Sequence, residues 1–335
     1  MKLLYKKEKY RRFNKHKVHK QTLKWIHKAI KKRSGKKHAD LDDANKAKCV
    51  SIKFPQNLFL SDEKEIIFEK LNHASQQNCV RLIFSKVQNI SIGSALYIKA
   101  YVDSHKEKQD IKISCSPQNK KMREILQHMD LKKYDMKLSC KDVLCWTFRS
   151  WTKNNPENYG KLMMEEILPK VLNGKIPSNE FSNLASNLHE LLYNCAEHAY
   201  TENDGFTGYY FIAGEYENRT GKSNKFSFAI IDMGQGFRSS LRKNNIFDNV
   251  MNKFHLTNDA ELIKAAVDGK FNANPDDDMG RGTGLTDVRD NIKKIGGTLN
   301  ISSDFGAYSY ESEERLINRK NVTIGSIITV NLPIN

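Results

Sequence analysis

Glu190-Leu-Leu-Tyr-Asn194-Cys-Ala-Glu-His198-Ala-Tyr200 places three polar side chains four residues apart. On a helix, Glu190, Asn194 and His198 form one polar stripe, because residues at this spacing lie one above another. The opposite, apolar flank is formed by Leu188, Leu191, Leu192 and Cys195. An Asn oxygen suits Mg2+, and a carboxylate one turn earlier can orient or deprotonate an attacking group. The stripe predicts a metal-dependent site; the alternative is a surface helix whose polar residues face water.

A second motif follows in Phe226-Ser-Phe-Ala-Ile-Ile-Asp232-Met-Gly234-Gln-Gly236. The run from Phe226 to Ile231 is short, aromatic and β-branched at its end, which predicts a buried strand. A carboxylate at the end of that strand can accept a hydrogen bond from the amino group of an adenine. Gly234 and Gly236 let the backbone approach a flat base. Taken alone, the motif is also compatible with an ordinary Asp-Gly turn.

A third motif is the glycine-rich segment Gly280-Arg281-Gly282-Thr283-Gly284-Leu285. The segment Leu285–Ile295 has apolar residues at 285, 288, 292 and 295, which predicts a helix ended by Gly296 and Gly297. Backbone N–H groups at the start of this helix suit phosphate oxygens. Arg281 could reach a terminal phosphate. The spacing is neither that of a Walker A loop nor that of a dinucleotide fingerprint.

In this order, the three motifs resemble the nucleotide-binding boxes of the GHKL superfamily of gyrase-type, Hsp90-type, histidine-kinase-type and MutL-type ATPases. The resemblance covers roughly residues 176–333 and implies an α/β fold of the α+β two-layer sandwich (Bergerat) type. It implies ATP and Mg2+ as cofactors, Glu190 as the catalytic residue, and Asn194 as the Mg2+ ligand with Glu190 as a further candidate. The implied nucleotide-binding residues are Asn194, His198, Asp232, Gly234, Gly236, Gly280, Arg281, Gly282, Thr283, Gly284 and Leu285.

The resemblance also places a mobile ATP lid at residues 237–279. This segment is rich in charges and contains a helix-like piece, Asp259–Val267. We interpret the acidic run Asp276–Asp278 as a solvated hinge, with an additional Mg2+ contact as the alternative. Beyond the third motif, residues 298–302 and 325–333 are predicted to form the closing strands.

Residues 49–136 alternate between strand-like and helix-like segments. Strands are predicted at 49–54, 79–85 and 111–115, and helices at 63–75, 93–102 and 120–131. This order indicates a small, mostly parallel α/β layer. It resembles the STAS fold of anti-sigma-factor antagonists, although the Asp-Ser-Ser-Gly motif of that family is absent. Ser91 and Ser94 lie at the position of its phosphorylated serine, and N-capping is the alternative role for both.

The positive charge of the chain is concentrated at its N-terminus. The formal net charge is +16, and residues 1–38 contain 16 Lys or Arg but a single acid, Glu8. Tyr10, Phe13 and Trp25 are interleaved with these cations, a pattern that suits a nucleic-acid backbone. An anionic lipid surface and a solubilising tail are the alternatives. We therefore expect a basic arm at 1–48, a STAS-like domain at 49–136 and an ATP-binding domain at 137–335.

The cysteine pattern and the hydropathy of the chain indicate its cellular compartment. The six cysteines form no CxxC pair, so we expect neither a zinc site nor a disulfide framework. No apolar run approaches the ~20 residues of a membrane span, and there is no secretory signal pattern. We therefore expect a cytoplasmic, reduced protein without a transmembrane segment.

The leading functional hypothesis is an ATP hydrolase that acts as a nucleotide-dependent switch on a protein or nucleic-acid partner. The first motif is most similar to that of anti-sigma-factor serine kinases, whose partners are STAS proteins. A Ser/Thr protein kinase with Glu190 as its base is therefore one alternative, and a non-catalytic ATP-binding module is another. The second and third motifs are more similar to the histidine-kinase form, which leaves the branch open.

Overall fold

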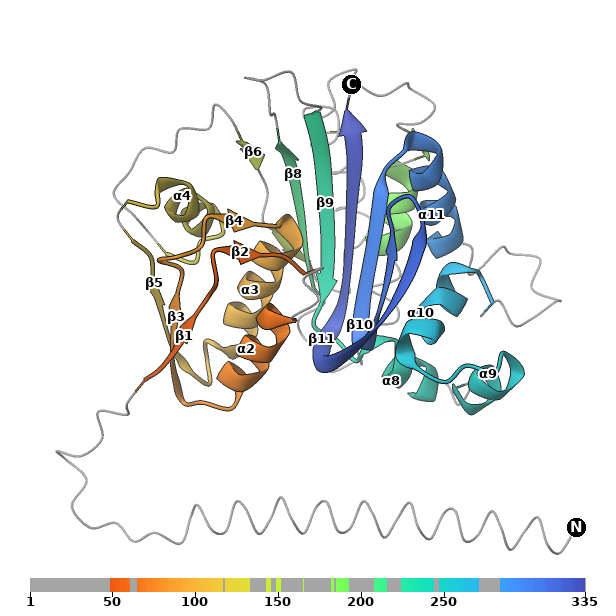
Figure 1. The fold of residues 1–335 in the computed structure, drawn as a ribbon, viewed down its shortest axis with the longest axis horizontal. Coiled ribbons are helices and arrows are strands. Elements are labelled where there is room, and N and C mark those ends of the chain that lie inside the picture. Colours follow the sequence, from red (N-terminus) through yellow and green to blue (C-terminus); the bar gives the residue numbers. More distant parts are fainter. Residues whose placement is uncertain are drawn as a thin grey trace, which may run out of the picture. The chain divides into compact units, whose positions relative to one another are not determined.

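The fold is described from a computed structural model. It covers residues 49–60, 65–116, 118–132, 143–145, 149–151, 165, 182–183, 185–192, 208–215, 224–243, 247–270 and 284–334. Residues Cys49–Asn335 form one compact unit that mixes helices with a parallel and an antiparallel sheet (Figure 1). None of the helices in the described ranges is long and apolar enough to cross a membrane.

The N-terminal part of this unit is a three-stranded parallel sheet in the order β1-β3-β5. Its strands are β1 (Val50–Lys53), β3 (Cys79–Ile83) and β5 (Asp110–Ser114), and its helices are α2 (Ile66–Ser75), α3 (Ile92–His105) and α4 (Lys120–His128). A short parallel pair, β2 (Asn57–Leu58) and β4 (Asn89–Ile90), lies beside it. The predicted βαβαβα order is confirmed for the three parallel strands and the three helices, whereas β2 and β4 were not predicted.

The C-terminal part is built on a six-stranded antiparallel sheet in the order β10-β11-β9-β8-β6, with β7 also paired to β8. The strands are β6 (Val143–Cys145), β7 (Arg149–Trp151), β8 (Gly208–Glu215), β9 (Asn224–Asp232), β10 (Thr298–Tyr310) and β11 (Glu314–Ile334). The predicted buried strand is confirmed as the central strand β9, in which residues 228–231 are fully buried. The closing strands β10 and β11 are longer than predicted.

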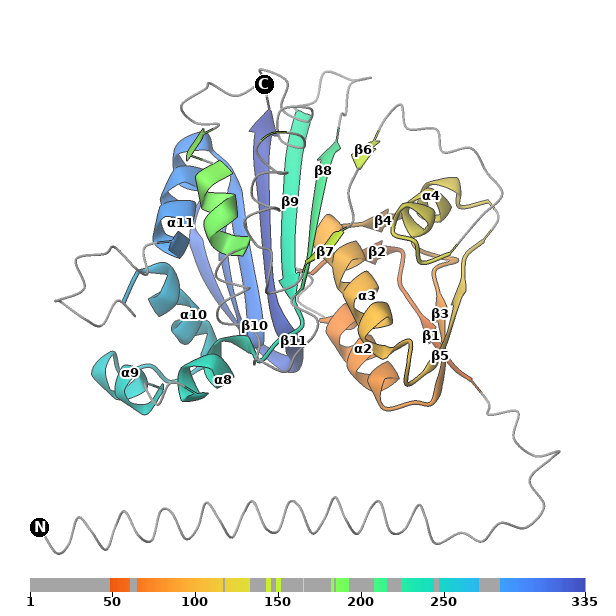
Figure 2. The same ribbon diagram turned by 180° about the vertical axis from the view of Figure 1, so that it is seen from behind.

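Helices cover both faces of the large sheet. Side chains alternate between the faces along β9, so that Ile230 and Asp232 share one face while Ala229 and Ile231 share the other. α3 packs on β9 and β8 on the face that carries Ala229 and Ile231, which we call the α3 face (Figure 1). The face that carries Ile230 and Asp232 is covered by α11 (Gly284–Ile295) and helical residues 185–192, and we call it the α11 face (Figure 2). The main apolar core contains residues from both helical layers and from the sheet between them, including Leu96, Ile230 and Ile292.

Polar contacts also join the N-terminal layer to β11. Glu65, which precedes α2 in a left-handed conformation, is buried and accepts hydrogen bonds from the backbone N–H groups of Lys320 and Asn321. Asn72 of α2 donates to the carbonyl of Val322 at 3.0 Å. These bonds satisfy a buried carboxylate, which would otherwise be costly to desolvate. The core and these contacts therefore join residues on both sides of the predicted domain boundary at 136/137. The boundary itself stays a prediction.

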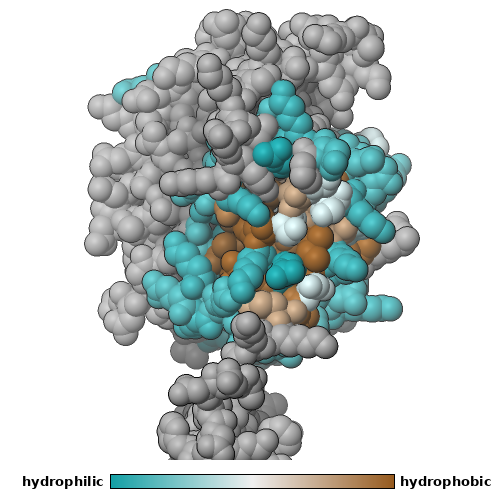
Figure 3. Space-filling view, turned by 90° about the vertical axis from the view of Figure 1, so that its left-hand side faces the viewer, coloured by the Kyte–Doolittle hydropathy of each residue, from teal (hydrophilic) through white to brown (hydrophobic). Residues whose placement is uncertain are grey.

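The side of the fold formed by β1, β3 and β5 is open. Ser51, Lys53, Arg81 and Lys112 point away from the helices and are exposed. On this side, hydrophilic residues surround a small group of apolar ones (Figure 3).

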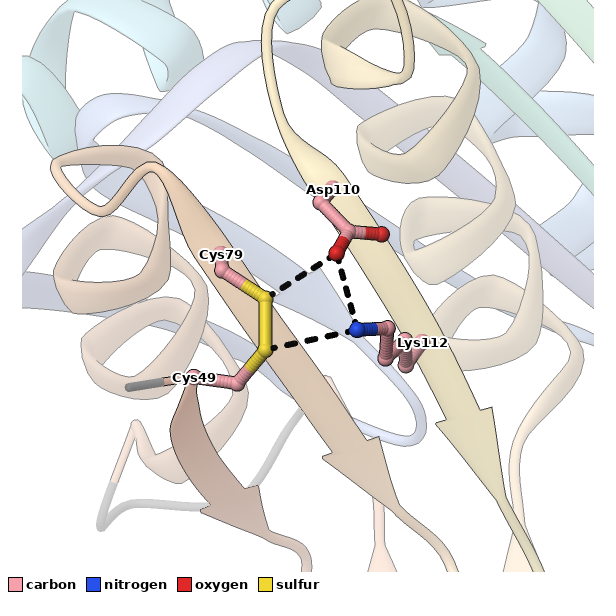
Figure 4. The surroundings of a disulfide bond; sticks show 4 residues. All are labelled: Cys49, Cys79, Asp110 and Lys112. Carbon is pink, nitrogen blue, oxygen red and sulfur yellow. Dashed lines mark hydrogen bonds and ion pairs between the residues drawn. A yellow bond between two sulfur atoms is a disulfide. The ribbon is translucent and has the colours of Figure 1, made fainter. Parts of the chain in front are cut away.

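Cys49 and Cys79 form a disulfide on this open face (Figure 4). The expectation of a reduced protein is therefore wrong at this pair. β1 and β3 pair in register with Val50 opposite Val80, which brings Cys49 opposite Cys79 with 4.6 Å between their Cα atoms. Asp110 Oδ2 lies 3.3 Å from Cys79 Sγ. Because the sulfur atoms are bonded to each other, this cluster does not present two thiolates to a metal ion.

Reduction of this disulfide should lower the stability of the chain. A cross-link that closes a loop of 30 residues restricts the unfolded chain, and the expected loss on its removal is about 3.6 kcal/mol of unfolding free energy. We expect this loss in Cys79→Ser, or in the wild type with dithiothreitol, when unfolding by urea is followed by circular dichroism. Cys115→Ser, which alters an unpaired cysteine, is the control. Equal midpoints for wild type and Cys79→Ser without reductant would contradict the prediction.

Candidate functional site

The candidate site is centred on Asp232, the last residue of β9. Its side chain is 3% exposed and lies on the α11 face of the sheet. Asp232 Oδ1 accepts a hydrogen bond from the N–H of Gly234 at 3.0 Å, which fixes the turn that follows the strand. A buried carboxylate is therefore held at the end of a central strand, where its orientation is set by backbone geometry.

Glycines allow the close packing around this turn. Gly325 of β11 has φ +71°, and a Cβ at this position would lie 1.9 Å from the carbonyl oxygen of Asp232. Gly236 has φ +75°, and a Cβ there would lie 2.8 Å from Asp304 Oδ2. Any side chain at either position would therefore displace the Asp232 turn or the strand beside it. The structure thus explains why position 236 requires glycine, through its close contact with Asp304 of β10, which the sequence did not indicate.

The segment after Gly236 is helical and is tied to β10. α8 (Gly236–Lys243) begins with two N–H groups, of Phe237 and Arg238, that donate to Ser303 Oγ and Asp304 Oδ2, each at 3.0 Å. Burial raises the pKa of the Asp304 carboxyl, and the charge of Asp259 acts in the same direction. The positive end of α8 is thus occupied by side chains of the protein itself.

Much of the predicted lid is helical in the described residues. α9 (Phe247–Lys253) and α10 (Asp259–Val267) follow α8, and α10 spans the predicted helix-like piece in full. Asn258 caps α10 by accepting from the N–H of Glu261. Ile263 and Val267 belong to the main core, and buried Asp259 forms an ion pair with Arg238. If part of 237–279 moves, α10 should therefore remain packed against the sheet while the rest of the segment moves. The lid itself stays a prediction.

The predicted helix of the third motif is confirmed as α11. Val288 and Ile292 are buried, and Leu285 and Ile295 pack against the core, as their spacing predicted. The helix ends at a left-handed Gly296, where the N–H of Gly297 donates to the carbonyl of Ile292. Gly284, the first residue of α11, is buried.

Helical residues 185–192 lie beside α11 on the same face of the sheet (Figure 2). Leu188, Leu191 and Leu192 are buried, which confirms the apolar flank for these three residues. Glu190 is half-buried and lies on a different side of the helix. The α11 face therefore carries Glu190, Asp232 and the start of α11, although these residues come from three distant parts of the sequence.

The remaining predicted site residues lie outside the described part of the chain. They are Asn194, His198, Gly280, Arg281, Gly282 and Thr283, together with the acidic run 276–278 and the basic arm 1–48.

Two buried amide nitrogens, one on helical residues 185–192 and one in the turn after Asp232, were not predicted. The side-chain nitrogens of Asn187 and Gln235 are buried and have no acceptor within the described residues. Asn187 lies one turn before Glu190, and Gln235 lies between the two glycines of the second motif. Buried donors of this kind normally have an acceptor, so each is a candidate contact for a bound ligand. The apolar periodicity that identified the helix and the strand carries no information about such groups.

Ser91 and Ser94, the two serines considered as phosphorylation sites, have structural roles in the N-terminal layer. Ser91 caps α3, and its Oγ accepts from the N–H of Ser94 at 3.2 Å. Ser94 is fully buried. Its hydroxyl is therefore inaccessible to a phosphate donor in the folded state.

No protein-family model matches this chain, and no curated protein sequence matches it.

Proposed function

We propose that this chain is a GHKL-type ATP-binding protein that hydrolyses ATP and acts as a nucleotide-dependent switch. The observation that carries the proposal is the buried Asp232 at the end of β9, on the face covered by α11 and residues 185–192. A carboxylate in this setting accepts a hydrogen bond from the adenine amino group. The turn after Asp232, whose residues 233–235 are partly buried, provides the edge against which the base lies.

The proposed roles of the other residues follow from the resemblance of the three motifs to the GHKL nucleotide-binding boxes. The N–H groups at the start of α11 and the preceding glycine loop bind phosphate oxygens, with the helix dipole in support. Asn194 contributes an oxygen ligand to Mg2+, and Glu190 orients or deprotonates the attacking water. ATP binding changes the lid, and the lid conveys the state of the site to a protein or nucleic-acid partner. The proposed ATP site favours the cytoplasm, where ATP is available, although a disulfide such as Cys49–Cys79 is uncommon in that compartment.

Asp232→Ala should weaken nucleotide binding by a factor of about 5–160 or more. Removal of the acceptor leaves the adenine amino group unpaired in a buried pocket, a loss of about 1–3 kcal/mol or more. Isothermal titration calorimetry with Mg-ATP measures this loss, and circular dichroism verifies that the variant is folded.

Asp232→Asn separates the ligand contact from the turn. The Asn side-chain oxygen can still accept from the N–H of Gly234, while the other carboxylate oxygen becomes an amide donor. We expect this variant to fold and to lose both ATP affinity and the preference for ATP over inosine triphosphate. Glu313→Ala, at an exposed acid of the β10–β11 turn, is the control. Unchanged ATP affinity in a folded Asp232→Ala protein would rule out the assignment.

A further inference from the structure

A polar cavity lies on the α3 face of the sheet, whereas Asp232 lies on the α11 face. Its volume is about 120 Å3, and its walls come from the start of α3, from β9 and from the β10–β11 hairpin. One water needs only ~10–15 Å3 by this kind of measure, so the cavity has room for a small molecule. Its lining contains one cation, Arg319, and no Asp or Glu.

Arg319 is a buried cation without an ion-pair partner among the described residues. It is 8% exposed, and its guanidinium lies 4.6 Å from the ring centre of Phe68. Nη2 donates to the carbonyl of Leu60 and to Ser302 Oγ, both at 3.2 Å, whereas the buried Nε has no acceptor. Burial lowers the pKa of Arg319, and the charge of Glu65 acts in the opposite direction. Glu65, however, accepts from the backbone of Lys320 and Asn321 rather than from Arg319.

Further donors line the same cavity. α3 has 14 residues, and its first residues, Ile92 and Gly93, have N–H groups without an acceptor inside the helix. Gly93 allows the helix start to approach the sheet, because a Cβ there would lie 2.6 Å from Thr329 Cγ2. Ser309 donates to Asn300 Oδ1 at 2.6 Å, which leaves the Asn300 amide N–H groups as donors. A guanidinium, a helix N-terminus and an amide thus surround one small volume.

We propose that this cavity binds a phosphate group, either as the free anion or as part of a small phosphate monoester. A buried guanidinium and backbone N–H groups at a helix start are the donors that recognise tetrahedral oxyanions. The bound anion neutralises Arg319 and joins α3 to β10 and β11. This site lies on the opposite face from the proposed nucleotide site and does not depend on it.

Titration of the full-length protein with inorganic phosphate, at constant ionic strength set with chloride and with Mg2+ and a non-hydrolysable ATP analogue present, tests the proposal. We expect saturable binding of one phosphate per chain. Arg319→Gln should weaken it at least tenfold, and Arg315→Gln, at an exposed arginine of the same strand, should leave it unchanged. A second titration with methyl phosphate distinguishes a free-anion site from a monoester site. A free-anion site binds inorganic phosphate only, whereas a monoester site also binds methyl phosphate.

Asn300→Asp keeps the test decisive if Arg319→Gln fails to fold. The substituted carboxylate is nearly isosteric and can still accept from Ser309, but it places a negative charge in the cavity. We expect it to abolish saturable phosphate binding without loss of secondary structure. Absence of saturable binding in the wild type, or equal binding in folded Asn300→Asp, would overturn the proposal. The second result would assign the bound anion to other cations of the chain.

Discussion

Glu190→Ala should bind Mg-ATP with nearly wild-type affinity and should fail to release phosphate. In the proposed mechanism, Glu190 orients or deprotonates the attacking water, and a general base contributes about 10²–10⁴-fold to a rate. Its carboxylate is half-buried on residues 185–192, whose leucines are anchored in the core, so its removal should not disturb the fold. Single-turnover hydrolysis of γ-labelled ATP, together with ATP affinity from calorimetry, measures both effects.

Two further variants locate the effect. Glu190→Gln keeps the shape of the side chain and should be equally inactive, whereas His189→Ala, at the adjacent residue, should turn over normally. Asn194→Ala should instead remove the Mg2+-dependent part of ATP binding, because its proposed role is metal coordination. Wild-type turnover by Glu190→Ala would exclude Glu190 as the base and reduce the proposal to ATP binding.

The same labelled nucleotide separates hydrolysis from protein phosphorylation. Label recovered as free phosphate supports the ATPase, and label on protein serine supports the kinase. Ser94 is fully buried, so labelling of the folded chain would fall on Ser91 or on a separate protein. Label on Ser91 would reverse the order of the two hypotheses. Neither product, with ATP still bound, would leave the binding module as the correct description.

Elements with strong local patterns were predictable from the sequence. The apolar spacing of α11 and its terminal glycines gave both the buried face and the end of the helix, and α10 matches its predicted bounds. The hairpin of β10 and β11 was predicted only in part. Residues 303–324 include many polar and charged side chains, so they lack the alternation of a half-buried strand. Their burial depends on distant groups, such as Glu65 for the backbone of Lys320.

Pairings between distant segments were not predictable. Cys49 meets Cys79 only because β1 and β3 pair in a particular register. Arg319 is similar: an arginine in a polar stretch is normally exposed, and only the packing of α2 and β10 buries it. For the candidate site, the sequence indicated Asp232 and the start of α11. It did not indicate the unpaired amides of Asn187 and Gln235, because burial of a single polar atom depends on tertiary packing.

The N-terminal arm should bind nucleic acid with a steep dependence on salt and without a requirement for ATP. Residues 1–38 contain 16 cations and one acid. Each Lys or Arg that contacts a phosphate releases a counterion, so log affinity should fall with log salt at about −0.9 per contact on duplex DNA. Even about six contacts would cost roughly a thousandfold in affinity between about 50 and 200 mM salt. Fluorescence anisotropy with labelled duplex and single-stranded DNA over this range gives the slope.

Deletion of residues 1–38 is the matched variant, since the remaining 297 residues contain 39 Lys or Arg and 38 acids. The truncated chain should lose the nucleic-acid binding and keep the ATP affinity of the full chain. Anionic vesicles compete as an alternative polyanion, because a basic segment with Leu23, Trp25, Ile26 and Ile30 can also lie on a lipid surface. Tight binding to vesicles, with no binding to DNA or RNA at low salt, would assign the arm to membranes and make these four residues its inserted side.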